Sequence, residues 1–189
     1  MTELQTATSA EARAIEGMVK ALVTGLIAYP EHLEIATREM NQSVLIEVRA
    51  HCDDTGKLLG YRRQTYLALQ TLVGLAAMRF MRIARLRVLD SVVGKPQGMA
   101  QFRPRDDWNM DRFDGILHRT LETIFVSYPG FKASHFTGGV SIYEVHVKQS
   151  EIERVPWRRV NESIKTVFDA IGKSMGRETQ VELFTEGAK

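Results

Sequence analysis

Apolar and polar residues alternate with two different periods in the first part of the chain. From Glu11 to Ala28 apolar residues recur three and four positions apart, which predicts a helix that ends at Tyr29-Pro30. The runs His32 to Glu39 and Ser43 to Ala50 alternate or are rich in β-branched residues, which is typical of strands. The dipeptide Asn41-Gln42 between them fits a tight hairpin turn.

The stretch from Thr55 to Met78 predicts a short helix, a basic turn and a long helix. Gly60 permits a sharp turn, Arg62 and Arg63 supply charge, and the N-terminus of the next helix offers unpaired N–H groups, so the turn favours a phosphate. The alternative is a glycine that only lets two helices meet, with solvated arginines. The long helix is expected to bury the following apolar residues: Tyr66, Leu69, Leu72, Val73, Ala76 and Ala77.

Polar residues flank these two helices. Asp53 or Asp54 is expected to cap the short helix. The run Ala84 to Leu89 is typical of a strand, and Arg85 and Arg87 would share its exposed face. They could extend a phosphate track, although a solvated sheet face is the alternative.

The second part of the chain repeats this order more weakly. Four short segments match at offsets of 96 to 99 residues: Ile15-Glu16-Gly17 with Phe113-Asp114-Gly115, Tyr29-Pro30 with Tyr128-Pro129, Glu47-Val48 with Glu144-Val145, and Tyr61-Arg62-Arg63 with Trp157-Arg158-Arg159. Expected elements are helices Asp111 to Ser127 and Val160 to Lys173, and strands Phe131 to Phe136, Val140 to Lys148 and Gln180 to Phe184. We interpret this as a duplication, with domains 11–90 and 112–185 joined by the linker 91–111, against the alternative of chance similarity.

The first domain resembles a type II KH domain, particularly the small bacterial KhpA-type RNA-binding proteins. The resemblance rests on the proline after the first helix and on Gly56-Lys57-Leu58-Leu59-Gly60-Tyr61-Arg62-Arg63, which is similar to the family's glycine-lysine and GXXG segment. It covers residues 15–90, and Phe113 to Phe184 in weaker form. It implies an α/β (α+β) fold of two tandem KH-like domains, each α-β-β-α-α-β with helices on one face of a three-stranded sheet.

The chain departs from the family at the GXXG loop. KH domains hold phosphates with the backbone N–H groups of this loop, but here Arg63 replaces the second glycine and Val155 to Arg159 contains none. Arginine side chains could replace that clamp, with Tyr61 and Trp157 stacking on bases. The expected RNA contacts are Lys57, Gly60, Tyr61, Arg62, Arg63, Trp157, Arg158 and Arg159.

Composition limits the other classes of function. A net charge of +2 over 189 residues does not indicate a general polyanion binder, so any basic site must be local. The single cysteine, Cys52, favours a reducing compartment, and the absence of long apolar runs or a signal-peptide pattern predicts a cytoplasmic protein without a membrane partner. Histidine and cysteine spacing and the missing catalytic motifs predict no metal, no cofactor and no enzymatic activity.

We therefore predict a non-enzymatic binder of single-stranded RNA that acts in post-transcriptional regulation or contacts ribosomal RNA. Two weak binding modules on one chain would together bind RNA more tightly than either alone, because the link raises their effective concentration. The alternative is a protein-interaction scaffold of degenerate KH domains, because an aromatic with two arginines also suits protein interfaces. The resemblance implies self-association, as a homodimer or as a pseudo-dimer of the two repeats.

Overall fold

The first half of the molecule is one α-β-β-α-α-β unit. A computed structural model describes residues 8–89, 109–127, 130–135 and 139–186. The elements of the first half (residues 8–89) are α1 (Ala10–Leu26), η1 (Pro30–His32), β1 (Glu34–Met40), β2 (Ser43–Arg49), α2 (Cys52–Leu59), η2 (Tyr61–Arg63), α3 (Gln64–Arg79) and β3 (Ile83–Leu89). This is the predicted order of elements, and the tight turn at Asn41-Gln42 is confirmed, with Asn41 at a φ of 45°.

The second half (residues 109–186) repeats the order. Its elements are α4 (Met110–Ile124), β4 (Phe131–His135), β5 (Val140–Lys148), α5 (Gln149–Ile152), α6 (Trp157–Ser174) and β6 (Glu178–Glu186). The predicted α+β fold of two KH-like units is therefore confirmed. Most of the predicted linker and the Tyr128-Pro129 pair lie outside the described residues.

Both halves have the same sheet topology. The strand orders are β1-β2-β3 and β4-β5-β6; in each sheet the central strand runs antiparallel to the first strand and parallel to the last. The last strand of each half therefore has one edge unpaired by any described strand.

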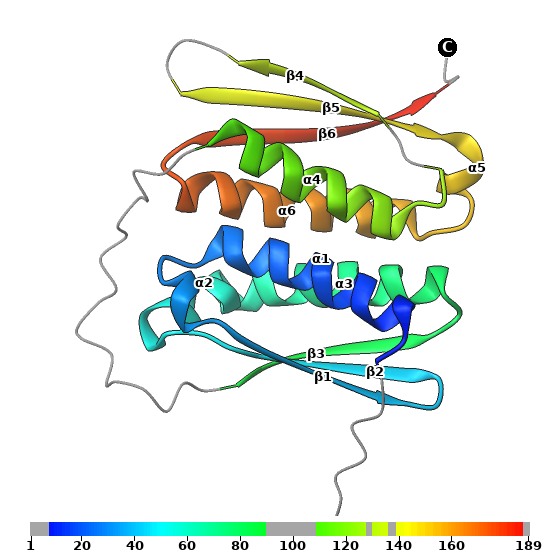
Figure 1. The fold of residues 1–189 in the computed structure, drawn as a ribbon. Coiled ribbons are helices and arrows are strands. Elements are labelled where there is room, and N and C mark those ends of the chain that lie inside the picture. Colours follow the sequence, from blue (N-terminus) through cyan, green and yellow to red (C-terminus); the bar gives the residue numbers. More distant parts are fainter. Residues whose placement is uncertain (1–7, 90–108, 128–129, 136–138, 187–189) are drawn as a thin grey trace, which may run out of the picture.

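The helices of the two halves pack against each other, and the sheets lie outside them. Figure 1 shows four layers: one sheet, the pair α1 and α3, the pair α4 and α6, and the second sheet. Apolar residues of all four helices and both sheets form one buried cluster. None of the helices formed by the described residues is both long and apolar enough to cross a membrane.

Close contacts fix the interface between the helix layers. A Cβ atom on Gly25 would lie 3.1 Å from the side chains of both Ile116 and Ile171, so only a very small residue fits there. The Ser174 hydroxyl donates a hydrogen bond to the carbonyl of Gly25, and the Arg79 guanidinium donates one to the carbonyl of Glu122. The halves are thus joined in the arrangement of a pseudo-dimer.

Strand register identifies corresponding residues of the two halves. Glu47-Val48 corresponds to Glu144-Val145, and because Val48 pairs with Val88 and Val145 with Leu183, β3 corresponds to β6 at an offset of 95 residues. The buried faces of α3 and α6 give the same offset: Ala68, Leu69, Leu72 and Val73 correspond to Ser163, Ile164, Val167 and Phe168. Trp157 therefore corresponds to Arg62, one position away from the match to Tyr61 made from sequence.

Candidate nucleic-acid interface

A strained turn joins α2 to α3. Gly60 has a φ of 69°, and a Cβ atom there would lie 2.2 Å from the hydroxyl oxygen of Thr65, so packing and backbone both require glycine. Arg62 and Arg63 follow with φ values of 49° and 63°, in the left-handed region that side chains other than glycine's disfavour. The sequence therefore keeps two strained residues at this turn, which is common at functional sites.

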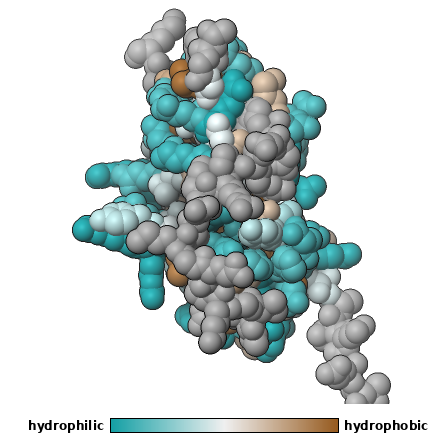
Figure 2. All heavy atoms as spheres, turned by 90° about the vertical axis from the view of Figure 1, so that its left-hand side faces the viewer, coloured by the Kyte–Doolittle hydropathy of each residue, from teal (hydrophilic) through white to brown (hydrophobic). Residues whose placement is uncertain are grey.

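The basic turn, Tyr61 to Arg63, presents its side chains to solvent. Tyr61 is 73% exposed, and the Arg62 guanidinium lies 5.1 Å from the centre of its ring. Neither Arg62 nor Arg63 forms an ion pair with any residue that the structure describes, so both charges are available to a ligand. The preceding helix α2 lies at the end of the molecule that faces the viewer in Figure 2, where the described surface is mostly hydrophilic.

Lys57, one of the predicted RNA contacts, has a partner inside the protein. Its Nζ atom lies 2.9 Å from the carboxylate of Asp54, which is fully buried. Asp54 also accepts the N–H groups of Ala28 and Tyr29, both at 2.9 Å. Lys57 therefore neutralises a buried charge, a role that the sequence pattern did not indicate.

The exposed face of β3 carries the arginines predicted there. Arg85 and Arg87 both project from this strand into solvent. The Arg87 guanidinium lies 3.3 Å from Glu47, which also pairs with Arg38 at 3.4 Å, whereas Arg85 has no ion pair with a described residue. Part of this charge is thus already balanced within the sheet.

The second half does not copy the basic turn. Trp157, Arg158 and Arg159 form the first turn of α6, so the prediction that they lie in a connecting turn is wrong. The offset between the halves falls from 97 residues at the central strand to 95 in α6, so this connection is shorter and leaves no room for the extra turn. Trp157 packs against the core, and the Arg158 side chain pairs with Glu162 at 2.9 Å.

The two predicted sites lie at opposite ends of the helix layers. Helices α3 and α6 run in opposite directions, so the basic turn and the start of α6 are far apart along them (Figure 1). Between the two helices lies a groove of about 320 Å³, whose lining is Gln64, Leu67, Ala68, Thr71, Arg159, Glu162, Ser163 and Thr166. The predicted residues therefore do not form one cluster.

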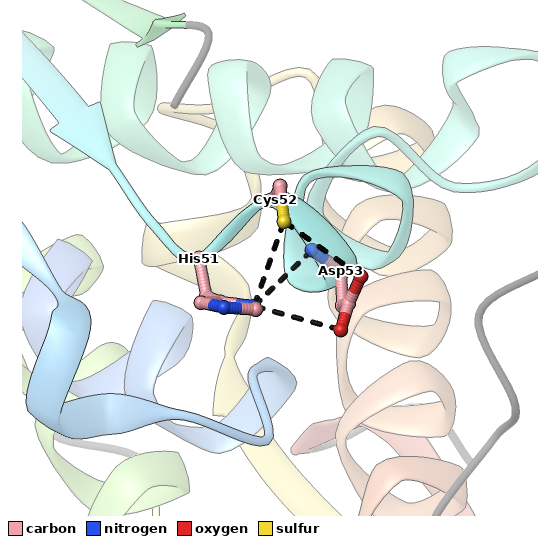
Figure 3. A group of neighbouring side chains, drawn as sticks. All are labelled: His51, Cys52 and Asp53. Carbon is pink, nitrogen blue, oxygen red and sulfur yellow. Dashed lines mark hydrogen bonds and ion pairs between the residues drawn. The ribbon is translucent and has the colours of Figure 1, made fainter. Parts of the chain in front are cut away.

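Three potential metal ligands lie close together at the start of α2: His51, Cys52 and Asp53 (Figure 3). His51 Nδ1 lies 3.7 Å from the Asp53 carboxylate and 3.8 Å from Cys52 Sγ. His51 Nδ1 also accepts the backbone N–H of Asp53 at 3.4 Å, which makes His51 the cap of α2. The prediction that Asp53 or Asp54 caps this helix is therefore wrong, since His51 comes before both and its ring takes that role.

Comparison with known proteins points to one family. A family model for the KH domain of KhpA and KhpB matches residues 16–88. The RNA-binding protein KhpA of Streptomyces coelicolor is 35% identical over 69 residues, which make up 36% of this chain and 87% of that protein. The RNA-binding proteins KhpA of Halalkalibacterium halodurans and Bacillus subtilis are 30% and 25% identical over 73 and 76 residues, or 39% and 40% of this chain and 96% and 94% of those proteins. Each relative thus matches a length close to that of one half of this chain.

Proposed function

Because this chain belongs to the KhpA/KhpB family of KH domains, we propose that it binds single-stranded RNA and that its first half is the principal binding module. The observation that carries this proposal is the exposed basic turn, where Arg62 and Arg63 have no acidic partner among the described residues. Binding of this kind is non-enzymatic, and it suits post-transcriptional regulation or contact with ribosomal RNA.

In this proposal, arginine side chains replace the phosphate contacts that the backbone makes in a loop with the second glycine, whose position Arg63 takes here. A guanidinium group can donate two parallel hydrogen bonds to one phosphate, so Arg62 and Arg63 would hold the RNA backbone. Tyr61 would stack on a base, which every base allows, so we expect little sequence preference at this position. Gly60 would shape the turn, and Lys57 would contribute mainly by holding α2 in place through Asp54.

The second half would contribute weaker contacts. Arg159 is exposed, and Arg158 forms only an exposed pair with Glu162, which a phosphate could displace at little cost. Trp157 is partly buried, so it offers less surface for stacking than Tyr61 does. The groove between α3 and α6 is lined by Gln64, next to the basic turn, and by Arg159, so one RNA that reaches both sites would follow this groove.

Salt-dependent binding of a labelled uridine-rich oligonucleotide tests the proposal. We expect the double variant Arg62→Ala/Arg63→Ala to lose about 10- to 100-fold in affinity at low salt and to reduce the slope of log K against log salt by about two. The variant Arg158→Ala/Arg159→Ala should lose less. The matched control is Arg13→Ala/Lys20→Ala, which removes two exposed charges from α1.

Two results would argue against RNA binding at the basic turn. The first is an absence of binding at low salt, which favours the scaffold hypothesis instead. The second is an equal loss of affinity in the control and the Arg62/Arg63 variant, which would mean that only net charge matters.

A further inference from the structure

The outer edge of the last strand is covered by side chains in the first half but not in the second. In β3 the backbone N–H of Leu86 donates to the side-chain oxygen of Gln70 at 3.0 Å, and its carbonyl accepts the Tyr66 hydroxyl at 2.9 Å. Two side chains from α3 thus cover the edge at this point. A covered edge cannot pair with another strand.

The second half lacks this cover. At the offset of 95 residues, Val181 corresponds to Leu86, Asn161 to Tyr66 and Lys165 to Gln70. No described side chain forms a hydrogen bond with the backbone of Val181, and the buried Oδ1 atom of Asn161 has no hydrogen-bond partner in the described part of the chain.

The outward direction of these backbone groups follows from the register. The N–H of Glu178 donates to Gly139 on the β5 side, so alternate residues from Glu178 face β5 and Val181 faces away from it. A groove of about 360 Å³ opens along this edge, and its lining is Lys165, Thr166, Asp169, Thr179, Gln180, Val181 and Glu182. The edge groove is therefore lined by a residue, Val181, whose N–H and carbonyl face away from β5 and pair with no described side chain.

The charge of the edge groove is opposite to that of its counterpart in the first half. The lining holds one cation, Lys165, and two anions, Asp169 and Glu182. The charged residues at the corresponding positions of the first half are Arg85 and Arg87. The formal charge of these residues thus changes from +2 to −1, and Arg87 and Asp169 each also pair with a residue outside the lining, Glu47 and Lys173. The change disfavours a polyanion and favours a cationic ligand.

We propose that the edge groove binds an extended, basic peptide segment of a partner protein, which adds a strand to β6. Backbone hydrogen bonds to Val181 supply the affinity in this mode, and alternate side chains of the peptide supply the specificity. Lysine or arginine side chains of the segment pair with Glu182 and with Asp169, whose carboxylate forms an exposed pair with Lys173 at 2.7 Å that a second cation displaces at little cost. RNA is then bound mainly by the first half, and the edge of β6 in the second half binds a protein partner.

NMR spectra of the backbone amides, recorded on the intact protein, test the proposed peptide binding directly. The probes are a capped octapeptide of alternating lysine and valine, the same peptide with glutamate for lysine, and a uridine octanucleotide. We expect the amide of Val181 to exchange with solvent about tenfold faster than that of Leu86 in the unbound protein. The lysine peptide should shift the Val181 resonance and slow its exchange, and the glutamate peptide should do neither.

A double variant that gives the second half the two covering side chains of the first half tests the role of the strand edge separately from that of the rest of the groove. Asn161→Tyr/Lys165→Gln should protect the Val181 amide and abolish its response to the lysine peptide. Asp169→Lys/Glu182→Lys leaves the backbone of Val181 uncovered but reverses the charge of the groove. This variant should bind the glutamate peptide in preference to the lysine peptide. Retained dispersion of the other amide resonances shows that each variant is folded.

Three outcomes would overturn the proposal: a Val181 amide as protected as that of Leu86 in the unbound protein, equal peptide binding by wild type and the Asn161→Tyr/Lys165→Gln variant, or a response of Val181 to the uridine octanucleotide rather than to the peptide. RNA binding at the basic turn is read from the amides of Tyr61 to Arg63 in the same titration. Failure of one proposal is therefore distinguishable from failure of the other.

Discussion

Asp54 and Glu151 occupy corresponding positions in the two halves and make the same contacts. Asp54 accepts the N–H groups of Ala28 and Tyr29 just beyond α1, and Glu151 accepts those of Val126 and Ser127 just beyond α4, at 3.1 and 3.2 Å. Each carboxylate is buried and has a basic residue three positions later, at 2.9 Å in the first half and 4.0 Å in the second. The two halves are therefore alike in individual hydrogen bonds as well as in element order.

This arrangement predicts that Asp54→Asn is strongly destabilising. The amide keeps one acceptor oxygen for two N–H groups and leaves Lys57 without its partner. We expect a loss of about 3 kcal/mol in the free energy of unfolding, measured by urea denaturation at pH 7. Asp53→Asn, at a side chain that is 26% exposed, is the control and should cost less than about 1 kcal/mol. Equal effects of the two substitutions would contradict the assigned role of Asp54.

Gly60 and Gly56 should respond oppositely to alanine. At Gly60 the added Cβ atom would meet Thr65 and the backbone would be held at a φ of 69°, so we expect Gly60→Ala to cost about 2–3 kcal/mol. Gly56 lies within α2, and nothing lies within 4 Å of an added Cβ atom, so Gly56→Ala should stabilise by about 0.5–1 kcal/mol. Thermal unfolding of the two variants measures both. A neutral Gly60→Ala would show that the turn can adopt another conformation.

Much of the fold could be predicted from periodicity alone. The alternating run Val140 to Lys148 has the same bounds as β5, and the apolar spacing from Tyr66 to Ala77 matches the core-facing side of α3. These signals are strong because burial of one face imposes a regular spacing on the sequence. The family resemblance implied that the two halves associate, but no local pattern specifies which helices meet.

The candidate site was less accessible to sequence analysis. Lys57 looked available because its partner, Asp54, is buried by elements distant in sequence. Trp157 matched Tyr61 by residue type, but the shorter connection before it places it inside α6. In the sequence, the two residues that cover Leu86 are visible only as Tyr66 and Gln70, four positions apart on one helix. Solvent exposure or packing would explain that spacing equally well. In each case the decisive information is a contact between elements.

Glu39 links the N-terminus of α1 to Arg82, the residue just before β3, and this link should depend on pH. Its carboxylate accepts the Ser9 N–H at 2.9 Å and pairs with Arg82, and these contacts, the Ser9 bond first, hold its pKa below the usual 4.5. A lowered carboxyl pKa contributes stability above the unfolded-state value, and that contribution is lost as the pH falls through the lower folded-state value.

Glu39→Gln should therefore lower Tm at pH 7, and its difference from the wild type should shrink as the pH falls below 4.5. Thermal unfolding followed by circular dichroism from pH 7 to pH 3 measures this. Glu34→Gln, at an exposed residue of the same strand, is the control and should leave Tm nearly unchanged at every pH. A difference that stays constant down to the lowest pH would mean that Glu39 acts by packing and not by charge.

Arg63→Gly connects the strain of the basic turn to its proposed function. Arg63 has a φ of 63°, where glycine is favoured, so this variant should be more stable than Arg63→Ala by about 1 kcal/mol although both lack the guanidinium. Arg63→Gly also restores the second glycine of the family's loop, and with it the close approach of backbone N–H groups to a phosphate. We therefore expect it to bind RNA more tightly than Arg63→Ala and with a shallower salt dependence than the wild type. Equal RNA affinities of the two variants would show that this loop binds through its side chains alone, and that the left-handed backbone at Arg63 serves only to aim the guanidinium.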